Sequence, residues 1–140
     1  MADMTLLLES WGQQKATDPR YYRLTENQTQ KFVFQGRQWG HPSNFAAVTF
    51  DCMPAESLSL TCNAIWPPSL DTQYCRLLEQ AIGYGLIEAL LAKTFYPYRG
   101  CALTLTAIEW DDVMSSEVAF YRASKGAMDK LIAEATWHLL

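Results

Sequence analysis

The feature that most constrains how this chain can fold is a regular repeat of small and apolar residues near its end. They recur three or four residues apart, at Phe120, Ala123, Ala127, Leu131 and Ala135. This spacing places their side chains on one face of an α-helix. Charged residues fall mostly on the other face, where Lys125–Asp129 and Lys130–Glu134 are spaced for weak ion pairs. The pattern predicts an amphipathic helix whose apolar stripe covers a sheet.

Three stretches in the first half of the chain have the composition or alternation of β-strands. Residues 31–35 are aromatic and β-branched, whereas residues 45–53 and 58–64 alternate apolar and polar side chains. Residues 36–44 are dense in turn formers and predict a long loop. The spacing of the three strands predicts an antiparallel meander with one solvent-exposed face.

The second half predicts a helix, a strand and the final helix. Pro67 and Pro68 end the third strand, and Asp71 is a good N-cap for a helix over residues 72–93. Gly83 and Gly85 inside that helix indicate close approach to a sheet. Residues 102–108 predict a fourth strand. The order β-β-β-α-β-α predicts an α+β two-layer sandwich, a four-stranded sheet with two helices on one face. Its expected core residues are Val48, Phe50, Leu60, Ile82, Leu103, Phe120 and Leu131.

Length and charge narrow the class of protein. The 140 residues fit one domain, which we divide into an N-terminal extension or extra strand (1–30) and a main domain (31–140). The net charge of −4 argues mildly against general nucleic-acid binding but leaves room for a local basic patch. No stretch is apolar enough to span a membrane, and the cysteines lack paired spacing. We expect a cytoplasmic protein with reduced thiols, no metal and no cofactor.

A series of short motifs spans residues 31–135. In chain order they are Lys31-Phe32-x-x-Gln35 with Gly36-Arg37, Asn63-Ala64-Ile65, Gly85-x-x-Glu88-Ala89, Phe95-Tyr96-Pro97 and Ser115-Ser116-Glu117-x-Ala119-Phe120. Together they resemble the fourth domain of translation elongation factor G. The resemblance implies the fold of that domain, which is shared with a small-subunit ribosomal protein and with small-molecule kinases of the galactokinase type.

The sequence departs from that family where the family contacts its target. The usual Asp-Ser-Ser-Glu before the last helix has Met114 in place of Asp, so we expect Ser115 to cap instead. Asp at position 114 is then expected to restore a cap, unless Met114 fills an apolar gap. The family's tip loop, Asp-Gly-x-x-His, is replaced by an acidic one in which Asp111 takes the place of the histidine.

The resemblance implies a free-standing relative of an arm that reaches into the decoding region of the ribosome. Two loops, 36–44 and 109–114, are expected to converge at its tip. The candidate contact residues there are Arg37, Gln38, Trp39, His41, Trp110 and Asp111. Arginine and tryptophan suit single-stranded RNA, whereas the carboxylates of the second loop repel phosphates. The alternative, which we prefer, is that Trp39 and Trp110 pack over the sheet end and that the charges of the loops are merely solvated.

Two classes of function remain open. The first is a non-catalytic, translation-related domain that contacts the ribosome or RNA, which the ordered motifs favour. The second is a protein–protein interaction module that kept the fold and lost the ribosomal role, which the acidic loop and the net charge favour. The chain has neither the phosphate-binding Gly-x4-Gly-Lys-Ser/Thr spacing nor a Ser-His-Asp set, so we expect no GTPase domain, nucleotide binding or enzyme activity.

Overall fold

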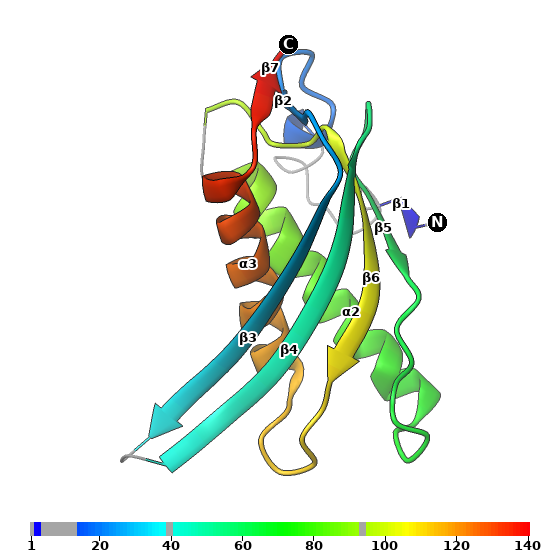
Figure 1. Cartoon of the computed structure of the whole chain (residues 1–140). Coiled ribbons are helices and arrows are strands. Elements are labelled where there is room, and N and C mark those ends of the chain that lie inside the picture. The colour runs from blue at the N-terminus through cyan, green and yellow to red at the C-terminus, as the bar shows by residue number, and fades with distance from the viewer. Residues whose placement is uncertain (1, 4–13, 39–40, 93–94) are drawn as a thin grey trace.

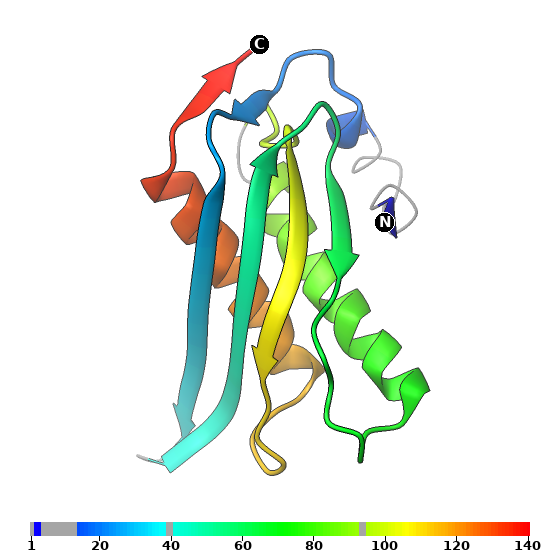
Figure 2. The same cartoon turned by 45° about the vertical axis from the view of Figure 1, so that its right-hand side comes forward.

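Helices α2 (Thr72–Ile87) and α3 (Glu117–Glu134) pack side by side on one face of a mixed sheet, and the other face is open (Figures 1 and 2). The structure is a computed structural model that describes residues 2–3, 14–38, 41–92 and 95–140. The strands of the sheet are β1 (Ala2–Asp3), β3 (Gln28–Gln38), β4 (His41–Pro54), β5 (Ser59–Cys62) and β6 (Cys101–Glu109). The predicted α+β two-layer sandwich and its four main strands are confirmed.

The order of strands across the sheet is β1-β5-β6-β4-β3. β3 and β4 form the predicted antiparallel hairpin, but β6 lies between β4 and β5 and is parallel to β5. The prediction of a three-strand meander is therefore wrong after its second strand. Alternation shows which face of a strand is buried, but it does not show which strand is its neighbour. The helical connection from β5 to β6 is long enough for the crossover that parallel neighbours require.

The predicted loop over residues 36–44 is largely strand, so that prediction is also wrong. The β3–β4 ladder continues past a register shift at Gly36/Arg37 and ends with the pairs Arg37–Pro42 and Gln38–His41. β6 has already ended here, since its last pair with β4 is Ala47–Glu109. This part of β4 pairs on one side only, so a proline without an N–H group is tolerated.

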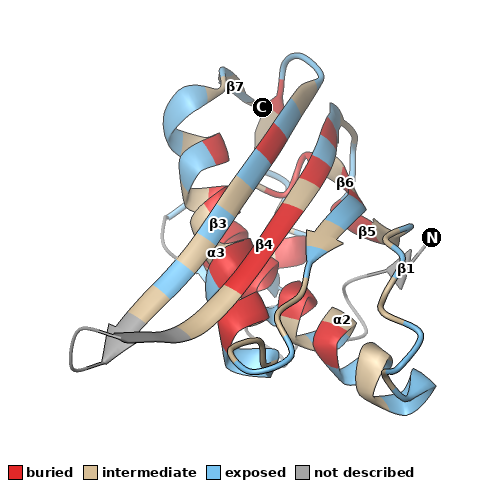
Figure 3. Ribbon diagram, turned by 60° about the horizontal axis from the view of Figure 1, so that its bottom comes forward, coloured by how far each residue is buried: buried red, intermediate tan, exposed pale blue. Residues whose placement is uncertain are grey.

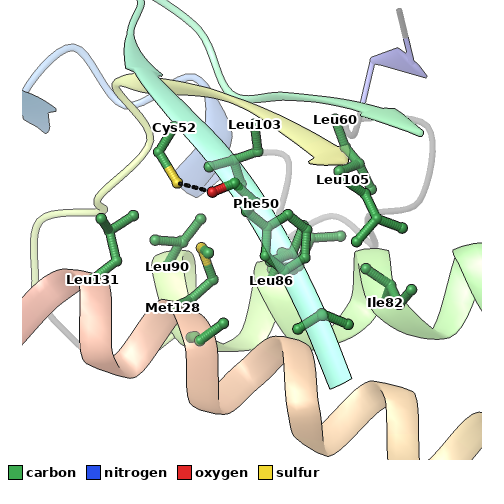
Figure 4. Packing of buried hydrophobic residues seen from close by; sticks show 14 of the residues in the cluster. Phe50, Cys52, Leu60, Ile82, Leu86, Leu90, Leu103, Leu105, Met128 and Leu131 are labelled. Atoms are coloured by element: carbon green, nitrogen blue, oxygen red, sulfur yellow. Dashed lines mark hydrogen bonds between the residues drawn. The ribbon is translucent and has the colours of Figure 1, made fainter. Parts of the chain in front are cut away.

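The core fills the space between the sheet and the two helices (Figure 3). All the predicted core residues are buried: Val48, Phe50, Leu60, Ile82, Leu103, Phe120 and Leu131. Figure 4 shows Phe50 reaching from β4 among leucines of α2 and β6 and beside Met128 of α3. On α2, Leu78 has no exposed surface, whereas its neighbour Leu77 is 44% exposed. Among the described residues, no helix is long and apolar enough to cross a bilayer.

α2 and α3 pack tightly against each other at Gly85. A Cβ atom on Gly85 would lie 2.2 Å from Ser124 Oγ and 2.4 Å from the Tyr121 carbonyl oxygen. Ser124 Oγ also donates a hydrogen bond to the Ile82 carbonyl oxygen across the interface, at 3.1 Å. The close approach predicted from this glycine is therefore to the second helix and not to the sheet. Beyond Gly85, α2 widens into the π-helical segment η2 (Glu88–Ala92), whose Glu88 pairs with Lys125 of α3 at 3.1 Å.

A small second sheet closes the far end of the sandwich. It pairs β2 (Tyr22–Leu24) with β7 (Trp137–Leu139). Arg99 fixes the adjoining loops, because its guanidinium donates to the carbonyl oxygens of Asp18 and Glu56 and lies 3.5 Å from the centre of the Tyr21 ring. Within the N-terminal extension or extra strand expected over residues 1–30, residues 4–13 lie outside the described residues. The four cysteines are free thiols, and burial raises the pKa of both Cys52 and Cys62 to about 12.

Candidate functional site

The two stretches predicted to form a tip lie at the same end of the molecule (Figures 1 and 3). The loop after β6 is fastened to β4 by two hydrogen bonds at Phe45. The Phe45 N–H group donates to the Met114 carbonyl oxygen at 3.1 Å, and Ser115 Oγ donates to the Phe45 carbonyl oxygen at 2.7 Å. This loop therefore sits against the body, at the level where the β3–β4 hairpin leaves it.

The hairpin continues beyond that level as a two-stranded arm. His41 lies four residues before Phe45 on β4, which corresponds to about 14 Å of extended strand. Arg37 and Gln38 end β3 and His41 begins β4, so these residues lie near the end of the arm. Trp39 lies outside the described residues. Arg37, Gln38 and His41 therefore lie at the same end of the molecule as Trp110 and Asp111. They lie farther from the body, because the arm extends past the loop that carries Trp110 and Asp111.

Charge is segregated between the arm and the loop. No aspartate or glutamate occurs from Gln28 to Phe50, a stretch that carries Lys31 and Arg37. The Lys31 ammonium lies 3.3 Å from a carboxylate oxygen of Glu109, on the open face of the sheet. The loop after β6 carries the carboxylates of Asp111 and Asp112. The chain as a whole is acidic, and its projecting arm is not.

Trp110 packs onto the body as an extension of the core. Its ring stacks on Phe120, with centroids 6.0 Å apart and planes 12° from parallel, and meets the Tyr74 ring edge-on at 6.2 Å. Its Nε1–H group donates to a carboxylate oxygen of Asp112 at 2.9 Å. The prediction that Trp110 packs over the sheet end is confirmed, and its ring is half-buried.

The loop carboxylates and serines shape the turn into α3, so the expectation that the carboxylates of Asp111 and Asp112 are merely solvated is wrong. Asp111 Oδ1 accepts from the N–H groups of Val113 and Met114, each at 2.9 Å. Ser116 is the N-cap, and its Oγ accepts from the Ala119 N–H group at 3.2 Å. The expectation that Ser115 caps the helix is wrong, because its hydroxyl binds Phe45 and the Asp111 N–H group. Position 114 lies two residues before the cap, so it is not a vacant capping site.

Replacing Ser116 by alanine is expected to lower the free energy of unfolding by about 0.5–2 kcal/mol, the usual cost of losing a capping hydroxyl. Met114→Asp, in contrast, is expected to bring no capping gain. Urea unfolding of both variants beside the unchanged protein measures these effects. Stabilisation by Met114→Asp of more than about 0.5 kcal/mol would show that the helix starts two residues earlier than the structure places it.

The open face of the sheet carries a shallow hollow of about 520 Å³. Hydroxyl, amide and carboxylate groups line it, among them Thr29, Asp51, Asn63 and Thr104. Thr29 Oγ1 and Asp51 Oδ1 are already hydrogen-bonded to each other, at 3.1 Å. Within the described ranges, no three His, Cys, Asp or Glu side chains are placed to hold a metal ion.

Comparison with known proteins identifies a fold and no family. Neither a scan against protein-family models nor a search of curated proteins gives a match. Among solved structures, the chain is similar to a protein from Thermus thermophilus, with a TM-score of 0.65 and 21% sequence identity. The match covers 86% of this chain and 18% of that protein, so this chain corresponds to only one part of the Thermus protein. At this identity the likeness establishes the fold alone.

Proposed function

We propose that this domain is a non-catalytic relative of the fourth domain of elongation factor G and that it contacts RNA through its β3–β4 arm. The observation that carries the proposal is the arm itself, which projects about 14 Å past the body and carries no acidic residue. A narrow arm that carries arginine, amide and aromatic residues can enter a groove or a loop of folded RNA. Phosphate and base contacts of this kind are typical of proteins that bind single-stranded RNA.

Two further observations support a role in translation. The ordered motifs over residues 31–135 resemble that family, and the described β-β-β-α-β-α order agrees with the fold that the resemblance implies. The acidic loop beside the arm takes a structural role in this proposal. Its carboxylates bind backbone N–H groups and the Trp110 ring nitrogen, and they lie back from the end of the arm.

Co-sedimentation with ribosomes at low and moderate salt tests the proposal. Arg37→Glu is expected to reduce binding at least about tenfold, since a phosphate contact is replaced by a repulsive charge. Lys130→Glu is the matched control, because it makes the same charge change at an exposed site on α3, far from the arm. Equal losses in the two variants would mean that only the net charge matters. Absence of binding at low salt would overturn the proposal.

A protein partner is the second candidate, and a specific observation favours it. Val113 in the loop after β6 is 91% exposed, and Ile65, after β5, is 90% exposed. Exposed apolar side chains suit contact with protein more than with RNA. The same co-sedimentation assay separates the two candidates. Contact through RNA predicts that Arg37→Glu lowers binding and Val113→Ser does not, whereas contact through protein predicts the reverse.

A further inference from the structure

Strand β3 forms one border of the sheet. It pairs with β4 on its inner side, and none of the described segments pairs with it on its outer side. Its eleven residues extend for about 37 Å. Backbone N–H and C=O groups along such a border are a template for another strand, and natural proteins usually protect them.

The usual protection is weak at this border. Lys31 is the only charged residue of β3 before Arg37, and its ammonium lies 3.3 Å from the Glu109 carboxylate of β6. The Lys31 side chain therefore extends inward across the open face and does not shield the outer side of β3 from another strand. The register shift at Gly36/Arg37 disturbs only the far end of the strand. Val33, between the two, is 48% exposed.

Helix α3 runs beneath the same border. The Phe32 ring lies over Gly126, where a Cβ atom would come within 2.5 Å of it, and the Phe34 ring lies 5.7 Å from the Arg122 guanidinium. Both rings are only half-buried. α3 packs against both β3 and β4 and crosses behind them at an angle, so its C-terminal end reaches past β3 (Figure 2). The border thus has two layers, a strand edge and a helix flank.

We infer that a second copy of this chain covers this border, with the two β3 strands antiparallel about a two-fold axis at Val33. The two sheets then form one continuous sheet. With a two-fold axis perpendicular to the joined sheet, the two α3 helices lie on the same face of that sheet and next to each other across the border. An extended peptide would pair with the strand edge but leave the helix flank and the half-buried phenylalanines uncovered. A second copy covers both layers.

Register and area agree with this arrangement. An axis at Val33 sets Lys31 opposite Gln35 and Phe32 opposite Phe34 of the second copy, so no like charges face each other. An axis at Phe34 would instead oppose Lys31 and Arg37. A border about 37 Å long, two layers deep except along the arm, buries roughly 600 Å² per copy, at the lower end of the range for standard interfaces. The border includes Arg37 and Gln38 at the end of β3, but the inference rests on strand pairing about Val33 and does not depend on RNA binding.

Sedimentation equilibrium of the full chain over a wide range of concentrations tests the inference. The unchanged protein is expected to form a dimer, and Val33→Lys is expected to raise its dissociation constant at least about tenfold, because two ammonium groups then face each other. Met53→Lys is the matched control. Met53 is 51% exposed on inner strand β4, so the same charge there should leave the dissociation constant unchanged.

Cross-linking tests the register. Directly opposed residues of antiparallel strands have Cα atoms about 4.5–5.5 Å apart, within the range of a disulfide. Mild oxidation of Val33→Cys should therefore give a covalent dimer, and Met53→Cys should not. A monomer at every concentration would overturn the inference, including a monomer that binds an added extended peptide at β3. A dimer that Val33→Lys leaves intact, or equal cross-linking of both cysteine variants, would also overturn it.

Discussion

Replacing Phe120 by alanine is expected to lower the free energy of unfolding by about 3–5 kcal/mol. The Phe120 side chain has no exposed surface. It supports two tryptophans, since the Trp66 ring meets it edge-on with centroids 5.2 Å apart and the Trp110 ring stacks on it at 6.0 Å. Removal of the ring leaves a cavity between α3 and both tryptophans, and a total stability of about 5–15 kcal/mol makes this a severe loss.

Denaturant unfolding monitored by tryptophan fluorescence measures this loss. Phe95→Ala is the control, because Phe95 is 80% exposed and its truncation should cost less than about 1 kcal/mol. A loss below about 1 kcal/mol for Phe120→Ala would mean that the register of α3 on the sheet is wrong.

Gly85→Ala is expected to destabilise the protein by about 2–3 kcal/mol, even though alanine is the better helix former by about 1 kcal/mol. The added methyl group would meet the backbone carbonyl oxygen of Tyr121 at 2.4 Å, so α2 and α3 would have to separate. Gly126→Ala makes the same chemical change where the methyl group meets only the half-buried Phe32 ring, which can swing outward.

Chemical denaturation of the two alanine variants should therefore give clearly different midpoints. Adding Ser124→Ala to Gly85→Ala should recover part of the loss, since it removes the hydroxyl at 2.2 Å and leaves the Tyr121 contact. Equal effects of Gly85→Ala and Gly126→Ala would contradict a tight helix–helix contact at Gly85.

Short-range patterns were sufficient to predict the layers of this fold. The stripe on α3 and the alternation on β4 depend only on which face of an element is buried, and both predictions hold for Phe120 and Phe50. The position of β6 between β4 and β5 depends on contacts between segments far apart in the chain, and alternation is the same for any neighbour. Gly85 signalled a close approach, but a glycine does not indicate what approaches it.

Prediction of the candidate site from the sequence was limited in the same way, because local composition does not show which segments pair. The composition of residues 36–44 signals a turn, and the structure places most of these residues in strands, because an isolated hairpin accepts glycine and proline on its solvent side. Trp110 was correctly predicted to pack on the body, since a large aromatic residue beside an apolar helix is usually covered. The capping role of Ser116 depends on where the helix begins. The sequence has two adjacent serines, and the side chain of either one can cap a helix, so the sequence does not show which one does.

The central position of β6 has a consequence for how the chain assembles as it is synthesised. β3 and β4 are made consecutively and can form their hairpin early, but β4 and β5 are not paired with each other, and both pair with β6. β6 ends at Glu109, 55 residues after the end of β4 at Pro54. Contacts between such distant segments form slowly, because a long loop must close first. Until then the inner edge of β4 is unpaired, and the nascent chain is most open to wrong strand pairing in the interval before β6 arrives.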